Sequence, residues 1–74
     1  MKYYRNDEAI KQFGVRVKKL RKQQRLSQKQ LAFEVGISDI QIRRIERGEI
    51  NTSLSVIVGL AQTFQISLKE LFDY

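Results

Sequence analysis

Residues 26–48 read LSQKQLAFEVGISDIQIRRIERG and contain one capping signal twice. In Ser27-x-x-Gln30, and again in Ser38-x-x-Gln41, the Ser side chain can accept the N–H of the residue three positions on. The Gln side chain can return a bond to the Ser N–H, which satisfies a second free donor at the helix start. Each pair therefore predicts the start of a short helix.

A glycine separates these two predicted helices. Gly36 can take the left-handed conformation that ends a helix in a tight turn, and the small Ala32 lets two helices cross closely. The second helix has an apolar face formed by Ile37, Ile42 and Ile45. The stretch predicts a helix-turn-helix over about residues 27–47.

Capping residues and apolar spacing predict three further helices. Asn6 or Asp7 can cap a first helix that runs to about Gln24, although Gly14 favours a start nearer to itself. Thr52 or Ser53 can begin a fourth helix, and Ser67-x-x-Glu70 is a third capping box that opens a short last one. The expected apolar stripe of the fourth helix consists of Leu54, Ile57, Val58, Ala61 and Phe64.

These elements predict an all-α fold, a compact bundle of five helices in one domain. The chain has 74 residues, no Pro and no alternating strand pattern. We expect an N-terminal arm over residues 1–8, where Tyr3, Tyr4 and Arg5 are possible contacts or part of a frayed end. The helix-turn-helix domain is expected over residues 9–74.

Composition argues against an enzyme. The chain has no Cys and no His, so it lacks disulfides, the usual zinc ligands and a His general base; we expect no cofactor and no metal. No apolar run approaches the roughly 20 residues of a membrane span, and the polar start does not resemble a signal peptide. We expect a cytoplasmic, nucleoid-associated protein without a membrane partner. The end of the sequence at Tyr74 leaves no room for a small-molecule ligand domain.

Charge is unevenly distributed. Residues 1–47 hold 13 basic and 5 acidic residues, a net +8, whereas residues 48–74 hold 1 and 3, a net −2. The basic part coincides with the predicted helix-turn-helix. Neutralising DNA phosphates releases counterions, so this segment favours double-stranded DNA as a partner. A basic, solvated surface without a partner is the alternative.

The second helix of the predicted pair has two different faces. Ile42, Ile45 and Glu46 turn toward the domain, and the opposite face carries Ile40, Arg43, Arg44 and Arg47. In the major groove, Arg can donate two bonds to guanine and an apolar group can contact a thymine methyl. We therefore predict that this face reads bases.

Other residues have both a DNA role and a structural alternative. Asp39 can accept from a cytosine amino group or stabilise the helix dipole. Gln28 can donate to a phosphate at the start of its helix, or be a neutral first residue. Arg47 and the backbone after Gly48 form a second candidate phosphate site. Gln41 is also a candidate DNA contact, although its capping box competes for the same side chain.

Arg21 and Glu46 are both flanked by expected core positions. We predict that they form a partly buried ion pair, in which removal of one residue would leave the other charge unpaired. Two solvated, unrelated charges are the alternative.

The stretch from Val17 to Leu71 resembles the Cro and phage-repressor type of helix-turn-helix domain, the XRE family. The resemblance extends over RVKKLR at 16–21, LSQKQLA at 26–32, VGIS at 35–38 and IRRIERG at 42–48, and continues from Leu60-Ala61 to Ile66-Ser67-Leu68. It implies a five-helix fold that binds operator DNA as a homodimer.

The same resemblance implies roles for individual residues. Its base-reading positions fall on Asp39, Ile40 and Arg44, with Arg43 beside them; its phosphate contacts fall on Gln28, Arg47 and the backbone after Gly48; its internal ion pair falls on Arg21 and Glu46. For the dimer interface, the chain offers Ile66, Leu68, Phe72 and Tyr74, some of which must also fill the core. Thr52 and Phe33 depart from the family pattern, which usually has Pro and a polar residue there.

Two functional hypotheses follow. The first is a sequence-specific transcriptional regulator that binds a palindromic operator as a dimer, with residues 38–47 in the major groove. The second is an antitoxin-like protein-interaction module that sequesters a partner protein through Phe33, Val56 and the apolar C-terminal residues.

Overall fold

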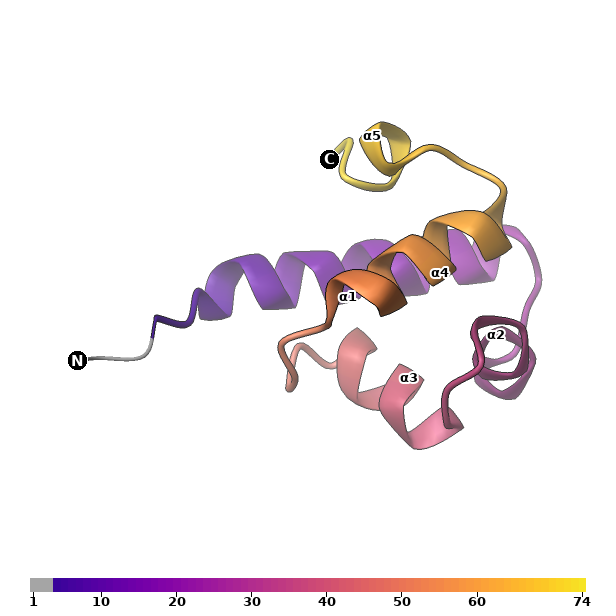
Figure 1. The fold of residues 1–74 in the computed structure, drawn as a ribbon, viewed down its shortest axis with the longest axis horizontal. Coiled ribbons are helices and arrows are strands. Elements are labelled where there is room, and N and C mark those ends of the chain that lie inside the picture. Colours follow the sequence, from indigo (N-terminus) through magenta and orange to yellow (C-terminus); the bar gives the residue numbers. More distant parts are fainter. Residues whose placement is uncertain (1–3) are drawn as a thin grey trace.

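The computed structural model describes residues 4–74, and this part of the chain is helical without any strand. The helices are α1 (Asp7–Gln23), α2 (Gln28–Val35), α3 (Asp39–Glu46), α4 (Leu54–Phe64) and α5 (Leu68–Leu71). The long α1 runs across the molecule behind α4, with α5 above and α2 and α3 below (Figure 1). The predicted all-α fold with five helices is confirmed, and no helix in residues 4–74 is long and apolar enough to cross a membrane.

Helix α1 begins earlier than Gly14. Asn6 is its N-cap and accepts the N–H of Ala9 at 3.0 Å, so the last two residues of the segment predicted as an arm are helical. Gly14 is buried within the helix, where a Cβ would overlap the backbone carbonyl oxygen of Ile45. The expectation of a start near Gly14 was therefore wrong: this glycine lets the α1 backbone pass directly against the end of α3.

The predicted capping boxes are formed at Ser27, Ser38 and Ser67. Each follows the same kind of turn, in which a residue with positive φ and an aliphatic residue precede the Ser. The positive-φ residues are Arg25 at 58°, Gly36 at 87° and Gln65 at 58°. Of the two candidates for the start of α4, Ser53 is the cap.

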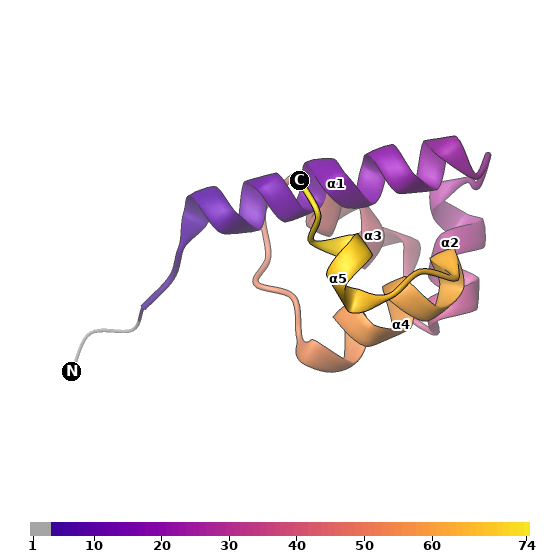
Figure 2. The ribbon, with the colours of Figure 1, turned by 90° about the horizontal axis from the view of Figure 1, so that it is seen from above.

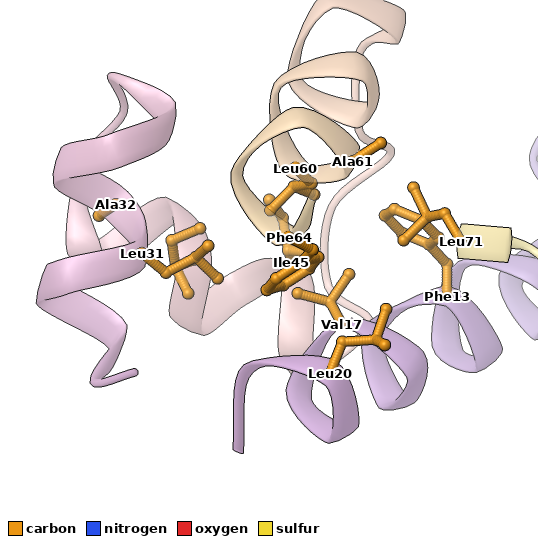
Figure 3. Close-up of a cluster of buried hydrophobic side chains, with 11 residues drawn as sticks. Phe13, Val17, Leu20, Leu31, Ala32, Ile45, Leu60, Ala61, Phe64 and Leu71 are labelled. Atoms are coloured by element: carbon orange, nitrogen blue, oxygen red, sulfur yellow. The ribbon is translucent and has the colours of Figure 1, made fainter. Parts of the chain in front are cut away.

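The core lies where all five helices meet. Figure 3 shows Val17 and Leu20 of α1 facing Ile45 of α3 and Phe64 of α4. The other buried apolar residues are Phe13, Leu31, Ala32, Ile42, Leu60, Ala61 and Leu71. The expected stripe of α4 is only partly confirmed: Ala61 and Phe64 are buried and Ile57 packs against the core, but Leu54 is exposed and Val58 is only partly buried. Leu60, which the stripe did not include, is fully buried.

The C-terminal residues return to α1, as Figure 2 shows. Arg16 holds them there, since its Nε donates to the carbonyl oxygen of Leu71 at 3.1 Å and its Nη2 donates to that of Glu70 at 2.7 Å. Helix α1 thus contacts α3 through Gly14 and α5 through Arg16.

Candidate nucleic-acid interface

Helix α3 presents one face to the core and the other to solvent. Ile42 and Ile45 are fully buried against the rest of the domain, and this anchors the helix. On the opposite face Ile40 is 54% exposed, and Arg43, Arg44 and Arg47 are exposed around it. An apolar side chain surrounded by three guanidinium groups therefore projects from a rigidly supported helix, as the periodicity predicted.

Two of the candidate base-reading residues interact with each other. Arg43 Nη2 lies 3.7 Å from Asp39 Oδ2, an exposed ion pair across one helical turn. Such surface pairs contribute little free energy, so both side chains can be released to a ligand at small cost. Arg44 has no ion-pair partner within residues 4–74, which leaves its guanidinium free to donate.

Gln41 and Gln28 are both engaged in the structure. Gln41 Oε1 accepts the N–H of Ser38 at 3.2 Å, so its capping role holds the side chain at the start of α3. Gln28 Nε2 donates to Glu46 Oε1 at 3.1 Å, and this contact between the first residue of α2 and the last residue of α3 was not predicted from the sequence. Gln28 is therefore more than a neutral first residue of α2, because its side chain also binds the end of α3.

The ion pair predicted between Arg21 and Glu46 is present and buried. Arg21 Nε donates to Glu46 Oε2 at 2.7 Å and Arg21 Nη2 donates to Oε1 at 3.0 Å, a two-bond arrangement. Arg21 Nη1 donates to the carbonyl oxygen of Leu26 at 2.9 Å. The hydrogen bonds to Glu46 raise the pKa of Arg21, burial acts to lower it, and the charge of Glu46 raises it further. The pair ties α1 to α3 and to the turn before α2.

The loop after α3 is fixed by the segment that precedes α1. Arg5 Nη2 donates to the carbonyl oxygen of Glu49 at 2.9 Å, and Arg5 Nε donates to Asp7 Oδ1 at 2.7 Å. Gly48 has φ 71° and lies so close to Lys11 that a Cβ would clash with it. The backbone after Gly48 is therefore held in place beside the exposed Arg47. Of the other two candidate contacts of the arm, Tyr4 is exposed and Tyr3 lies outside the described residues.

The four residues predicted for a dimer interface differ in their surroundings. Ile66 packs against the core. Phe72 stacks on Phe13 with ring centroids 5.4 Å apart, and Tyr74 lies under the guanidinium of Arg16 at 6.0 Å, so both rings already have neighbours in their own chain. Leu68 is 43% exposed at the start of α5. Phe72 and Tyr74 also remain exposed, so these three side chains leave apolar surface at the C-terminal end of the domain.

Comparison with known proteins assigns the family. The helix-turn-helix family model (HTH_3) matches residues 17–71, which includes α2, α3 and the turn between them. The chain belongs to this helix-turn-helix family. This is the XRE type of helix-turn-helix that the sequence motifs resemble. The matched residues include the helices that carry the candidate DNA contacts.

Individual relatives agree with this assignment. The chain is 35% identical over 63 residues to the control protein C.BamHI of Bacillus amyloliquefaciens, covering 84% of this chain and 78% of the relative. The crystal structure of the restriction-modification controller protein C.AhdI from Aeromonas hydrophila superposes with a TM-score of 0.84 at 38% identity, covering 88% of this chain and 98% of C.AhdI.

A repressor bound to DNA has the same fold. The P22 c2 repressor, solved in complex with a synthetic operator, superposes with a TM-score of 0.75 at 28% identity, covering 82% of this chain and 92% of the repressor. The relatives are thus a control protein, a controller protein and a repressor. The predictions of a helix-turn-helix regulator and against an enzyme are confirmed by these relatives and by the family.

Proposed function

We propose that this protein regulates transcription by binding a specific DNA sequence with α3 in the major groove. The observation that carries the proposal is the outward face of α3, where exposed Ile40 and unpaired Arg44 project from a helix whose other face is buried. Arg44 donates two bonds to a guanine and Ile40 contacts a thymine methyl. Asp39 accepts from a cytosine amino group and Arg43, released from it, reaches a neighbouring base or phosphate.

The DNA backbone is held at the two ends of the helix pair. Gln28, with the first N–H groups of α2, donates to one phosphate. Arg47 and the N–H groups after Gly48 donate to another, on a loop that Arg5 fixes in position. The oxygen of the Gln41 side chain remains in the capping box, and its free Nε2 donates to the DNA backbone. Phosphate contacts set the register of α3 on the duplex and leave sequence selection to the base contacts.

The active species is a homodimer on a palindromic site. A two-fold axis places the two α3 helices about 34 Å apart, one turn of DNA. Leu68 supplies the exposed centre of the interface, with Phe72, Tyr74 and Ile66 around it. The likeness to the P22 c2 repressor bound to its operator supports the DNA role, and the two controller proteins support regulation of transcription. The protein then acts on the DNA of the cytoplasm.

Selection of bound duplexes from a random library at physiological salt tests this proposal. Enrichment of a palindrome supports it. Arg44→Ala should then lose discrimination at one base pair of each half-site, by about 1–3 kcal/mol, because a bidentate contact is removed. Equal weakening on every sequence would show that Arg44 contacts phosphate instead.

An antitoxin-like module is the second candidate, favoured by Phe33, which is 84% exposed on α2. In this role, Phe33 and Val56 bind a partner protein. Retention of duplexes without enrichment of any sequence, together with co-purification of one small protein that Phe33→Ser abolishes, would support it over the operator-binding role.

A further inference from the structure

The carboxylate of Glu46 has more partners than an ion pair requires. Its Oε2 accepts from Arg21 Nε at 2.7 Å, while its Oε1 accepts both from Arg21 Nη2 at 3.0 Å and from Gln28 Nε2 at 3.1 Å. The Glu46 side chain is 3% exposed and that of Arg21 is 10% exposed. Gln28 is half-buried at the edge of this buried group, so the three residues form a chain of contacts from the interior to the surface at the start of α2.

The side-chain amide of Gln28 keeps a donor for a ligand. An amide nitrogen carries two hydrogens, and the bond to Glu46 uses one. The backbone N–H groups of Gln28 and Lys29 are the first two of α2 and have no partner within the helix, whereas that of Gln30 is bonded to Ser27 Oγ at 3.0 Å. The free hydrogen of Gln28 Nε2 and these two N–H groups lie at the same helix end.

We propose that Glu46 is a positioning residue for DNA binding: it fixes the Gln28 side chain as a phosphate donor before DNA arrives. The inference rests on the proposed function and deepens it. A free Gln side chain loses rotamer entropy when it is immobilised on a ligand, and the bond to Glu46 removes that loss from the binding step. Arg21 has a second part in this arrangement, because it neutralises Glu46 and so prevents a buried anion from repelling the phosphate.

A double-mutant cycle on DNA affinity tests the positioning role. Gln28→Met keeps the length of the side chain and removes its donors, so it should weaken binding several-fold and by the same factor on selected and unrelated duplexes. In a Glu46→Met background, which removes the acceptor, the same substitution should cost clearly less, because the Gln28 side chain is no longer fixed. An equal fold-loss in both backgrounds would overturn the proposal. Unfolding curves of all four proteins establish that binding is measured on folded chains.

A measurement on the unaltered protein makes the test independent of the stability of Glu46→Met. Side-chain ¹⁵N relaxation should show the Gln28 amide as ordered as the backbone of α2, whereas Gln62, exposed on α4, is the mobile reference. A Gln28 amide as mobile as that of Gln62 would overturn the proposal.

The same experiments separate this inference from the proposed function. If the unaltered chain retains no duplex at physiological salt, the proposed function fails. If it binds duplex while Gln28→Met has full affinity, only the positioning role fails.

Discussion

The turn at residues 25–31 and the turn at residues 65–71 have the same backbone design. Each begins with a residue at φ 58°, continues with an aliphatic residue and a Ser cap, and ends with a fully buried Leu. The main-chain bonds also match: Leu26 N donates to Arg21 O at 3.1 Å, and Ile66 N donates to Ala61 O at 3.0 Å. The two turns are therefore equivalent as local structures.

Their side chains differ. Where the first turn has Gln28 bonded to Glu46, the second has Leu68, which is exposed. In the first turn, the carbonyl oxygen of Leu26 accepts a bond from the buried Arg21. At the position that matches Arg21, the second turn has the apolar, buried Ala61. One local design thus serves two surfaces, a polar one that we assign to DNA and an apolar one that we assign to a second subunit.

The largest difference between the two turns should be in folding stability. Glu46→Ala leaves Arg21 buried without its partner, and we expect a loss of about 3–5 kcal/mol in the free energy of unfolding. Glu70→Ala removes only a capping bond of the second turn, at a cost of about 1 kcal/mol. Denaturant unfolding of both variants measures the contrast. Equal losses would mean that the buried pair contributes no more than a cap.

Self-association should depend on the second turn. Leu68→Gln replaces an exposed apolar side chain with Gln, the residue at the matching position of the first turn. We expect the dimer to become about tenfold weaker or more, because burial of a Leu side chain contributes about 1.5–3 kcal/mol. Sedimentation equilibrium measures this change. Phe33→Gln is the control, since it removes a more exposed apolar residue outside the proposed interface. A dimer that weakens only with Phe33→Gln would place the interface on α2.

DNA electrostatics should depend on the first turn. Lys29 and Lys69 occupy the same position, two residues after the Ser cap of each turn. Lys29→Ala should lower the slope of log affinity against log salt concentration by about 1, because it removes one positive charge beside Gln28 at the proposed phosphate site. Lys69→Ala should leave the slope unchanged. If both substitutions change it equally, the charges act at long range and the first turn has no special place on the DNA.

The smallest effect should come from the two left-handed residues. Arg25→Gly and Gln65→Gly each relieve a side chain at φ 58° but also increase the entropy of the unfolded chain, so we expect the stability of each to rise by at most about 1 kcal/mol. Thermal unfolding should give similar shifts for the two. DNA affinity should fall for Arg25→Gly alone, because it also removes a positive charge next to α2. A fall for both would point to a change in the fold rather than in charge.

The helices, their capping boxes and the two-faced character of α3 could all be predicted from the sequence. These features depend on residues within about one or two helical turns of each other, so spacing is enough to predict them. Ser27, Ser38 and Ser67 begin their helices as expected, and Ile42 and Ile45 are buried as expected. The Arg21–Glu46 pair was also found from its flanking apolar residues.

Apart from the Arg21–Glu46 pair, the contacts between residues far apart in the chain became visible only once the helices were packed together. From the sequence, Gly14 was expected to weaken its helix, whereas the structure places it against the carbonyl oxygen of Ile45. Leu54 was expected in the core, whereas the orientation of α4 leaves it exposed. The contacts of Gln28 with Glu46 and of Phe72 with Phe13 also join separate helices. The physical reason is the same in each case: a helix start is set by bonds between near neighbours in the chain, whereas close approach depends on how the buried faces of all five helices pack together.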